Sequence, residues 1–353
     1  MNALSVVLLA SAVASADAVA QVPLNTNAAE VVAFFARNVY GERPDLSDFK
    51  KTCSVADRGV DSALHAHRRD VTLNVMTPWG ETNFTAVSFE PEHPAGTRVP
   101  CFVYLSFQRP DEMLARPDDK SLKPWRWPVR DILARGFATV AFYYEDVFPD
   151  DPPSVCDWGR SFGRSATGWG AISTWALAAS RVMDWIETTE GPDASKVAVV
   201  GHSRLGKTAL WTGATDRRFA YTVINDSGCM GARMSTRNLP GGETIEIITS
   251  RFPHWFAPTC AAQFAGKDAQ LPFDQHWLLA SLAPRLVAVG SAEDDHWACP
   301  SGEHASIDLA RPAWGENRGR CHYHIRPGGH DITPVDWADY MDFAERHGWK
   351  GTR

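Results

Sequence analysis

The segment Lys196–Ala214, KVAVVGHSRLGKTALWTGA, decides the fold of this 353-residue chain. Its first part, Lys196–Gly201, is a short apolar run typical of a buried strand, and Arg204–Ala214 has the pattern of a helix. A serine between a strand and a helix, with glycines on both sides, can sit in a tight turn with its hydroxyl exposed near the helix N-terminus. Ser203 is therefore a candidate nucleophile, although its G-x-S-x-x-G spacing departs from the usual G-x-S-x-G. A helix-capping serine is the alternative.

Strands and helices alternate on both sides of this segment. Further strands are expected at Val71–Met76, Phe84–Phe89, Val99–Phe107, Phe137–Tyr144, Phe219–Ile224, Arg285–Ser291 and His322–Arg326. Helices are expected at Ala28–Val39, Val129–Arg135, Trp169–Thr189, Trp277–Ala283, His304–Ala310 and Pro334–His347. Asp146–Phe162 reads as a polar loop and Asp226–Leu271 as a long irregular segment. Apolar strands separated by helices indicate a mostly parallel sheet with helices on both faces, a three-layer α/β architecture.

The overall composition is that of an ordinary globular protein. Hydrophobic residues make up 44% and charged residues 22% of the chain, and the net charge is −7. This charge gives no electrostatic reason to expect nucleic acid or an anionic membrane as a partner. Because no linker or shift in composition appears, we expect residues 21–353 to form a single catalytic domain, most simply a monomer.

The first twenty residues differ from the rest. Val6–Ala14 is a largely apolar run, and Ala18–Ala20 has the small-x-small form of a signal-peptidase site. The run is too short to span a bilayer, and no Lys or Arg precedes it, which is unusual for a signal peptide. We expect residues 1–20 to be a signal peptide and the protein to be secreted or periplasmic.

Seven cysteines are spread along the chain, at positions 53, 101, 156, 229, 260, 299 and 321. They show no CxxC or zinc-like spacing. In an exported chain we expect some of them to pair, with at least one left over because the number is odd. We expect no metal and no cofactor: His296 beside Asp294 and Asp295 is a weak ligand set on a short stretch.

A histidine follows the last expected strand. The segment Arg326–Asp331 reads RPGGHD, and its two glycines allow a loop to fold back and present the imidazole of His330. In α/β-hydrolases the acid and then the histidine follow the serine along the chain. His330 is therefore the expected general base for Ser203.

Two carboxylates compete for the place of the acid that orients His330. Asp295 lies in the stretch EDDHW (Glu293–Trp297), which follows the strand Arg285–Ser291. Asp226 closes the strand Phe219–Ile224, 23 residues after Ser203. Both positions follow strands of the same parallel sheet, so the residues alone leave the choice open.

Two cations follow the serine on one helix face. The guanidinium of Arg204 could supplement a backbone N–H in stabilising an oxyanion, and Lys207 lies one turn further on, at i+3. The third expected strand ends without the HGGG oxyanion motif of many esterases, which favours such a role for Arg204. Two cations beside a serine nucleophile point to an oxygen-rich substrate with a carboxyl-derived group, rather than to a fatty ester.

These residues resemble a known family, the glucuronoyl esterases of carbohydrate esterase family 15, and especially its bacterial branch. The resemblance covers nearly the whole chain after residue 20. It is carried by VGHSRLGKTALWTGATDRRFA (Val200–Ala220), NDSGCMGA (Asn225–Ala232), FPHWF (Phe252–Phe256), LPFDQH (Leu271–His276), LAPR (Leu282–Arg285), DHW (Asp295–Trp297) and RPGGHD (Arg326–Asp331).

The resemblance implies an α/β-hydrolase fold and hydrolysis of the ester between (4-O-methyl-)glucuronic acid of glucuronoxylan and alcohols of lignin. By this similarity Ser203 is the nucleophile, His330 the base and Arg204 the oxyanion-stabilising arginine. Lys207 matches a lysine that contacts sugar hydroxyls, and Trp297 a tryptophan that lines the sugar pocket. The family places its acid at either the Asp226 or the Asp295 position, and Asp295 is slightly favoured here.

The chain also departs from the family pattern. His202 replaces the cysteine that precedes the serine in fungal members, and Glu243 and Arg251 have no assigned counterparts. An acetyl-xylan esterase or general carboxylesterase on the same fold is the nearest alternative. A non-catalytic carbohydrate-binding protein and a serine peptidase are further ones.

Overall fold

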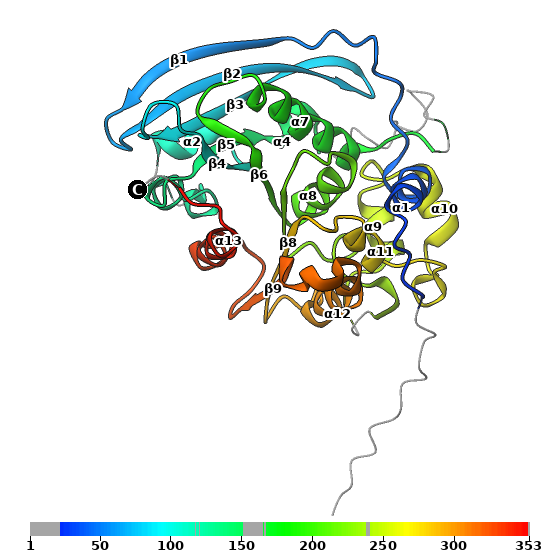
Figure 1. The fold of residues 1–353 in the computed structure, drawn as a ribbon. Coiled ribbons are helices and arrows are strands. Elements are labelled where there is room, and N and C mark those ends of the chain that lie inside the picture. Colours follow the sequence, from blue (N-terminus) through cyan, green and yellow to red (C-terminus); the bar gives the residue numbers. More distant parts are fainter. Residues whose placement is uncertain are drawn as a thin grey trace, which may run out of the picture.

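A nine-stranded sheet forms the centre of the computed structural model, which describes residues 22–116, 118–119, 121–150, 165, 167–237 and 241–351 (Figure 1). The strands lie in the order β1-β2-β3-β5-β4-β6-β7-β8-β9. Their bounds are β1 Cys53–Asp61, β2 Ala66–Thr77, β3 Gly80–Pro91, β4 Val99–Ser106, β5 Ala138–Tyr143, β6 Pro192–His202, β7 Tyr221–Asn225, β8 Leu286–Ala292 and β9 Cys321–Arg326.

The sheet has an antiparallel edge and a parallel main part. β1, β2 and β3 form an antiparallel meander, and β3 pairs antiparallel with β5. From β5 through β4, β6, β7 and β8 to β9 every neighbouring pair is parallel. The expected mostly parallel sheet is confirmed, and its parallel part brings the carboxyl ends of β6, β7, β8 and β9 to one edge.

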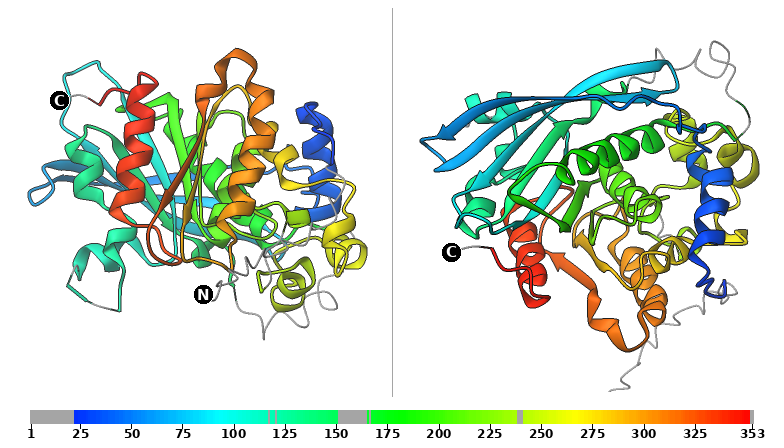
Figure 2. Two further views of the ribbon diagram at one scale, coloured as in Figure 1. Left: turned by 90° about the horizontal axis from the view of Figure 1, so that it is seen from below. Right: turned by 45° about the horizontal axis from the view of Figure 1, so that its top comes forward.

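Helices surround the sheet. The α-helices are α1 Ala28–Phe35, α2 Pro110–Ala115, α3 Val129–Ala134, α4 Tyr144–Val147, α7 Ala171–Ile186, α8 Arg204–Thr215, α9 Ile245–Arg251, α10 Pro258–Phe264, α11 Gln275–Ala280, α12 Pro300–Ala310 and α13 Pro334–Arg346. The views in Figure 2 show α13 and the α2–α3 region on one side of the sheet, and α7 and α8 on the other.

Both faces of the parallel strands are buried, as alternation along β4 shows. Cys101, Val103 and Leu105 pack into the core shared with α7 and α8. Phe102 and Tyr104, which point the opposite way, pack into a second core shared with α3 and α13. Successive residues of a strand face opposite sides, so a strand covered by helices on both faces must be apolar throughout. This explains why the central strands are readable as continuous apolar runs.

One expectation from the sequence is wrong in part, and one strand was not predicted. The stretch Asp226–Leu271 is not irregular throughout, since it contains α9 and α10. These helices have only seven residues each, too short for a clear helical periodicity. Strand β1 was not expected at all, because most of its side chains are exposed and it offers no apolar alternation. The expected signal peptide at residues 1–20 lies outside the described residues, as does most of the expected polar loop Asp146–Phe162.

The expected cysteine pairing is also not found. The six cysteines in the described ranges are all free, and all but Cys53 are buried; Cys156 lies outside these ranges. Four of the buried thiols, those of Cys101, Cys229, Cys260 and Cys321, belong to one apolar core. Burial raises the pKa of Cys229 to about 12, so its sulfur is a thiol rather than a reactive thiolate.

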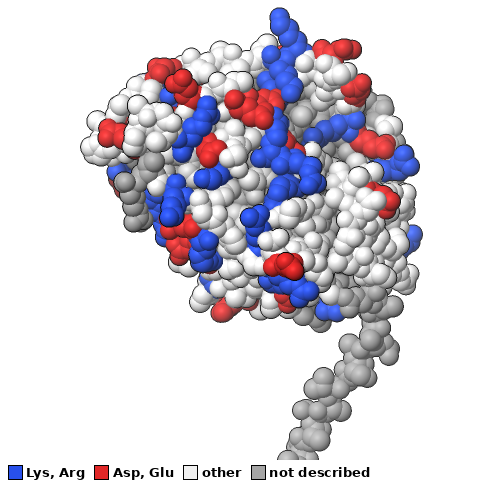
Figure 3. Space-filling view, viewed as in Figure 1, with Lys and Arg blue, Asp and Glu red and all other residues white. Residues whose placement is uncertain are grey.

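Charges of both signs share the surface. Lys and Arg form a band down the middle of the face seen in Figure 3, with Asp and Glu interspersed. Elsewhere in the chain such charges pair directly: the Asp184 carboxylate accepts from Lys51, Arg181 and Arg218. Within the described part of the chain, no helix is long and apolar enough to cross a membrane.

Candidate active site

The turn between β6 and α8 places Ser203 in a strained conformation. Its φ and ψ are 57° and −127°, and its N–H donates to the Asn225 carbonyl oxygen of the neighbouring strand at 2.9 Å. Glycines make the turn possible: a Cβ at Gly201 would lie 1.9 Å from the Leu205 carbonyl oxygen, and one at Gly206 would lie 2.9 Å from that of Asn225. A positive φ at a non-glycine residue costs about 1–3 kcal/mol and is typical of functional sites. The turn therefore matches the expected serine elbow rather than an ordinary helix cap.

A loop after β9 brings His330 to this serine. Its Nε2 lies 2.8 Å from Ser203 Oγ, although 127 residues separate the two in the chain. Arg326 holds the loop by donating to the carbonyl oxygens of Pro327, Gly329 and Asp331. The carboxylate of Asp331 is held in turn by the side chain of Arg126. The imidazole is 41% exposed, so a substrate can reach both it and the serine.

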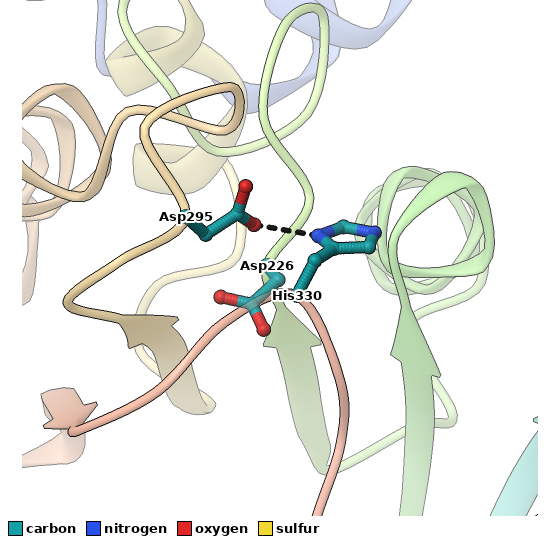
Figure 4. A group of neighbouring side chains, drawn as sticks. All are labelled: Asp226, Asp295 and His330. Atoms are coloured by element: carbon teal, nitrogen blue, oxygen red, sulfur yellow. Dashed lines mark hydrogen bonds and ion pairs between the residues drawn. The ribbon is translucent and has the colours of Figure 1, made fainter.

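The structure separates the two candidate acids. Asp295 Oδ2 lies 2.5 Å from His330 Nδ1, and its other oxygen accepts from the Ala298 N–H at 3.2 Å. The Asp226 carboxyl, at the end of β7, is turned away from the imidazole (Figure 4). A carboxylate only accepts hydrogen bonds, so His330 Nδ1 donates to Asp295 and Nε2 is left to accept from Ser203. This is the tautomer that a general base requires.

Asp226 lies in a different environment. It is 1% exposed, and neither of its carboxyl oxygens has a hydrogen-bond partner. Its nearest cation is Arg326, whose Nη2 lies 3.7 Å away. Burial first, and then the nearby carboxyl groups of Glu303 and Asp295, raise the pKa of Asp226 well above its usual value of 3.8. A proton on Asp226 is thereby favoured, which suits a buried acid that does not orient the histidine.

The same three residues also have the composition of a weak metal site. One ligand-type atom from each of Asp226, Asp295 and His330 lies within 4.8 Å of the others. Both imidazole nitrogens, however, already have partners in Asp295 and Ser203. This donor set therefore fits a proton relay better than a metal ion. His296, the other histidine considered from the sequence, is exposed and lies outside the group.

The buried ring of His202 packs against the ring of His330. The two ring centroids are 4.5 Å apart, and His202 Nδ1 lies 2.7 Å from Asn225 Oδ1. Because the Asn225 amide nitrogen donates to the Tyr340 hydroxyl, its oxygen accepts from His202. Burial, and secondarily the positive potential of His330 and Arg126, lowers the pKa of His202 well below 6.5. A neutral imidazole here does not oppose the positive charge that His330 acquires as a base.

A cavity of about 210 Å³ opens beside Ser203 and His330. Arg204 and Lys207, both predicted from the sequence, line it. Lys207 is 4% exposed, and its Nζ donates to the Ser227 carbonyl oxygen at 2.5 Å. Burial lowers the pKa of Lys207, and the Glu243 carboxylate partly offsets this. The cavity is thus a small pocket lined by two cations.

The rim of this cavity contains predicted and unassigned residues together. Trp297, predicted from the sequence, is 40% exposed and lines the cavity, with the Arg251 guanidinium 5.5 Å above its ring. Glu243 and Arg251, which had no assignment, line it as well. So do Phe252 and Trp255, whose FPHWF motif was visible in the sequence without a role. Aromatic side chains with a few convergent polar groups are typical of a small-molecule binding site.

A larger cavity, about 440 Å³, lies elsewhere in the described structure, between Leu64, Met113 and Trp125. It contains none of the predicted site residues. Catalytic chemistry therefore points to the smaller cavity.

Comparisons with known proteins identify the family of this chain. A family model described as glucuronyl esterase of fungi matches residues 129–316, more than half of the chain. The chain belongs to the glucuronoyl esterase family. The family and fold expected from the sequence are confirmed.

Individual glucuronoyl esterases are similar along much of the fold. The solved structure of a glucuronoyl esterase from Solibacter usitatus superimposes with a TM-score of 0.78 at 30% identity, covering 91% of this chain and 92% of that one. Carbohydrate esterase MZ0003, from an unknown prokaryotic organism, is 40% identical over 245 residues, which is 63% of this chain and 56% of that protein. The 4-O-methyl-glucuronoyl methylesterase of Podospora anserina is 30% identical over 189 residues, 51% of this chain and 39% of that one. The matched region thus spans about half or less of these two curated relatives.

The opposite environments of two buried aspartates predict opposite pH effects on stability. The pKa of Asp226 is raised, so the stability it contributes is greatest below its unfolded value near 3.8 and is lost as pH rises toward its folded value. Burial would raise the pKa of Asp336 too, but pairing with His324, Thr333 and Arg326 lowers it, so its contribution is present above 3.8 and is lost as pH falls.

Urea unfolding between about pH 2.5 and pH 8 tests this with Asp226→Asn and, as control, Asp336→Asn. We expect the free energy of unfolding of wild type, relative to Asp226→Asn, to fall as pH rises, by at most about 1.4 kcal/mol per pH unit. Relative to Asp336→Asn it should rise with pH only below about pH 4 and stay level above it, because the Asp336 carboxyl is then ionised in both the folded and the unfolded state. Two parallel, pH-independent differences would contradict the assignment.

Proposed function

We propose that this protein is a serine esterase that hydrolyses esters of (4-O-methyl-)glucuronic acid, using Ser203 as nucleophile, His330 as base and Asp295 as acid. One observation carries the proposal. A continuous relay, Asp295–His330–Ser203, has distances of 2.5 and 2.8 Å and lies beside a small cavity that Arg204 and Lys207 line. Family membership supports the same reaction.

The reaction begins when His330 Nε2 takes the proton of Ser203 Oγ as this oxygen attacks the uronate carbonyl carbon. A tetrahedral intermediate forms, with negative charge on the former carbonyl oxygen. Its collapse breaks the bond to the alcohol, which leaves with the proton from His330, and the uronoyl group stays esterified to Ser203. Water, deprotonated by His330, then attacks this ester and regenerates the serine hydroxyl. Asp295 holds the imidazole in the required tautomer and stabilises its cationic form.

Two donors at the start of α8 are suited to stabilise the tetrahedral oxyanion. The N–H of Arg204 belongs to the first turn of α8, where backbone N–H groups have no intrahelical acceptor. The Arg204 guanidinium lines the same cavity. Each well-placed donor commonly contributes about 3–4 kcal/mol to such a transition state.

The rest of the cavity suits a sugar ring. Lys207 can donate to ring hydroxyls and Glu243 can accept from them, while Trp297 offers an apolar face. A simple acetyl group would leave these groups unused. This favours a uronate ester over the acetyl ester of the nearest alternative, an acetyl-xylan esterase, and the intact relay argues against a purely carbohydrate-binding role.

We further propose glucuronoxylan esterified to lignin alcohols as the natural substrate class, because this is the ester that the family resemblance implies. We propose residues 21–353 as a single catalytic domain that acts as a monomer. Secretion or export to the periplasm would follow from the leader-like pattern in residues 1–20. A polymeric plant substrate is accessible only outside the cell, which supports export.

Turnover of methyl or benzyl glucuronate tests the proposed activity. We expect the purified protein to cleave these esters with a higher kcat/KM than an acetyl ester, because only the uronate ring engages Lys207, Glu243 and Trp297. Ser203→Ala should lower kcat by on the order of 10⁶-fold while folding is retained. Preferential cleavage of the acetyl ester would contradict the proposed uronate ester and make acetyl esters the substrate class. Substantial turnover by pure Ser203→Ala protein would contradict the assignment of Ser203 as nucleophile.

Comparison of Asp295→Asn with Asp226→Asn tests the choice of acid. An amide at 295 can donate to His330 Nδ1 and favour the wrong tautomer, so we expect kcat to fall by about 10⁴-fold. Asp226→Asn makes the closest control, since it alters a buried acid of the same cluster, and it should lower kcat less than tenfold. The reverse ranking would assign the role to Asp226.

A further inference from the structure

Asp150 is a buried acid that the proposed reaction does not itself use. It lies three residues after α4, and its side chain has no exposed surface. Its Oδ1 accepts from His254 Nε2 and from Trp255 Nε1, each at 2.7 Å. Its Oδ2 accepts from the Tyr144 hydroxyl at 3.1 Å and from Arg204 Nη1. Four donors from three parts of the chain thus converge on one carboxylate.

These partners keep Asp150 ionised. Burial alone would raise its pKa, but the hydrogen bond from His254 and the attraction to Arg204 outweigh burial and lower it below 3.8. A buried carboxylate with satisfied oxygens forms strong charge-assisted hydrogen bonds. Removing it would leave the Arg204 charge without its partner.

The guanidinium of Arg204 is fixed on several sides. Its carbon lies 4.8 Å from the ring centroid of Trp255, 5.3 Å from that of Phe252 and 5.8 Å from that of Phe107. Nε is buried without an acceptor, and Nη1 is bonded to Asp150. Nη2 is neither bonded to Asp150 nor among the buried nitrogens without a partner, and Arg204 lines the cavity, so Nη2 is the nitrogen available to a substrate. An arginine side chain otherwise carries about 2 kcal/mol of rotamer entropy, which would be lost on orientation at the oxyanion.

We propose that Asp150 is a positioning residue for catalysis: it holds the Arg204 fork so that Nη2 meets the oxyanion that forms at the substrate carbonyl. This role rests on the proposed function, in which Arg204 stabilises that oxyanion. The guanidinium is oriented before the substrate arrives, so no reorganisation is needed in the transition state. Asp150 acts through Arg204 and does not touch the substrate.

A purely structural role would look different in kinetics. If Asp150 only fixed His254 and Trp255 to α4, its removal would harm the enzyme whether or not Arg204 were present. If it acts through Arg204, its removal should matter only while Arg204 is there. A double-mutant cycle separates the two cases.

The cycle uses Asp150→Asn, Arg204→Gln and the double variant, each checked by thermal unfolding and assayed on methyl glucuronate and on an activated acetyl ester. We expect Asp150→Asn to lower kcat about 10–100-fold with KM changed less than about threefold, because the lost interaction is made in the transition state. Arg204→Gln should lower kcat by about 10²–10³-fold. The double variant should be within about threefold of Arg204→Gln alone.

Asp216→Asn is the matched control. Asp216 is another largely buried aspartate, paired with Arg218 at the end of α8 opposite to Ser203. It should leave both kcat and KM unchanged. Arg204→Lys is a second probe that leaves Asp150 intact. A lysine can pair with Asp150 but cannot also present a second fixed nitrogen, so we expect it to lose most of the kcat that Arg204→Gln loses.

Three results would each overturn the proposal. The first is a double variant whose loss of kcat equals the product of the two single losses. The others are wild-type kcat in a folded Asp150→Asn variant and full kcat in Arg204→Lys. Every ester forms an oxyanion, so the cycle can be read on the acetyl ester even if uronate esters prove not to be substrates. That result would overturn the substrate class while the Asp150 role stands. Turnover of neither ester by the wild type would overturn both.

Discussion

The turn that joins β6 to α8 is the constraint on which the rest of the site depends. It holds Ser203 at a positive φ, and the two neighbouring glycines allow backbone atoms to pass where a side chain would clash. Because α8 begins immediately after the serine, Arg204 and Lys207 lie at the start of this helix, beside the nucleophile. A different turn would separate the hydroxyl from both cations at once.

The parallel sheet then supplies the other groups. β7, β8 and β9 lie beside β6 in order, so the loops that follow them meet at the same edge. Asp226 comes from the first of these loops, Asp295 from the second and His330 from the third. The two aspartates differ in their surroundings. Asp295 has the imidazole as partner, whereas Asp226 is buried without a hydrogen bond, which raises its pKa. One edge of the sheet thereby provides both an orienting carboxylate and a second, buried acid whose pKa is raised.

Sequence reasoning reached the parts of the fold whose residues are buried on both faces. β4 to β9, α7, α8 and α13 lie within a few residues of their expected positions because their apolar patterns are complete. β1 was not predicted because most of its side chains are exposed, and α9 and α10 were not predicted because they are short. In the site, Ser203 and His330 were identifiable from glycine-bounded turns after strands, and Arg204, Lys207 and Trp297 from the motifs around them.

The choice between the acids could not be made from the sequence, because Asp226 and Asp295 both follow neighbouring strands. Their positions in the folded chain separate the two acids. Asp226 directly follows β7 and its N–H is still bonded to the Gly290 carbonyl oxygen of β8, which keeps its side chain below the imidazole. Asp295 comes three residues after β8 ends, which gives the chain length to reach His330. Asp150 had no signal at all, since 54 residues separate it from Arg204.

Titration with a fluorophosphonate that phosphonylates activated serine hydroxyls tests the central claim most directly. If His330 and Asp295 activate Ser203 for attack on the uronate ester, one equivalent of reagent should abolish hydrolysis, and peptide mapping should find the label on Ser203 alone. Inactivation through a different residue, or full turnover of glucuronate esters after stoichiometric labelling of Ser203, would contradict it.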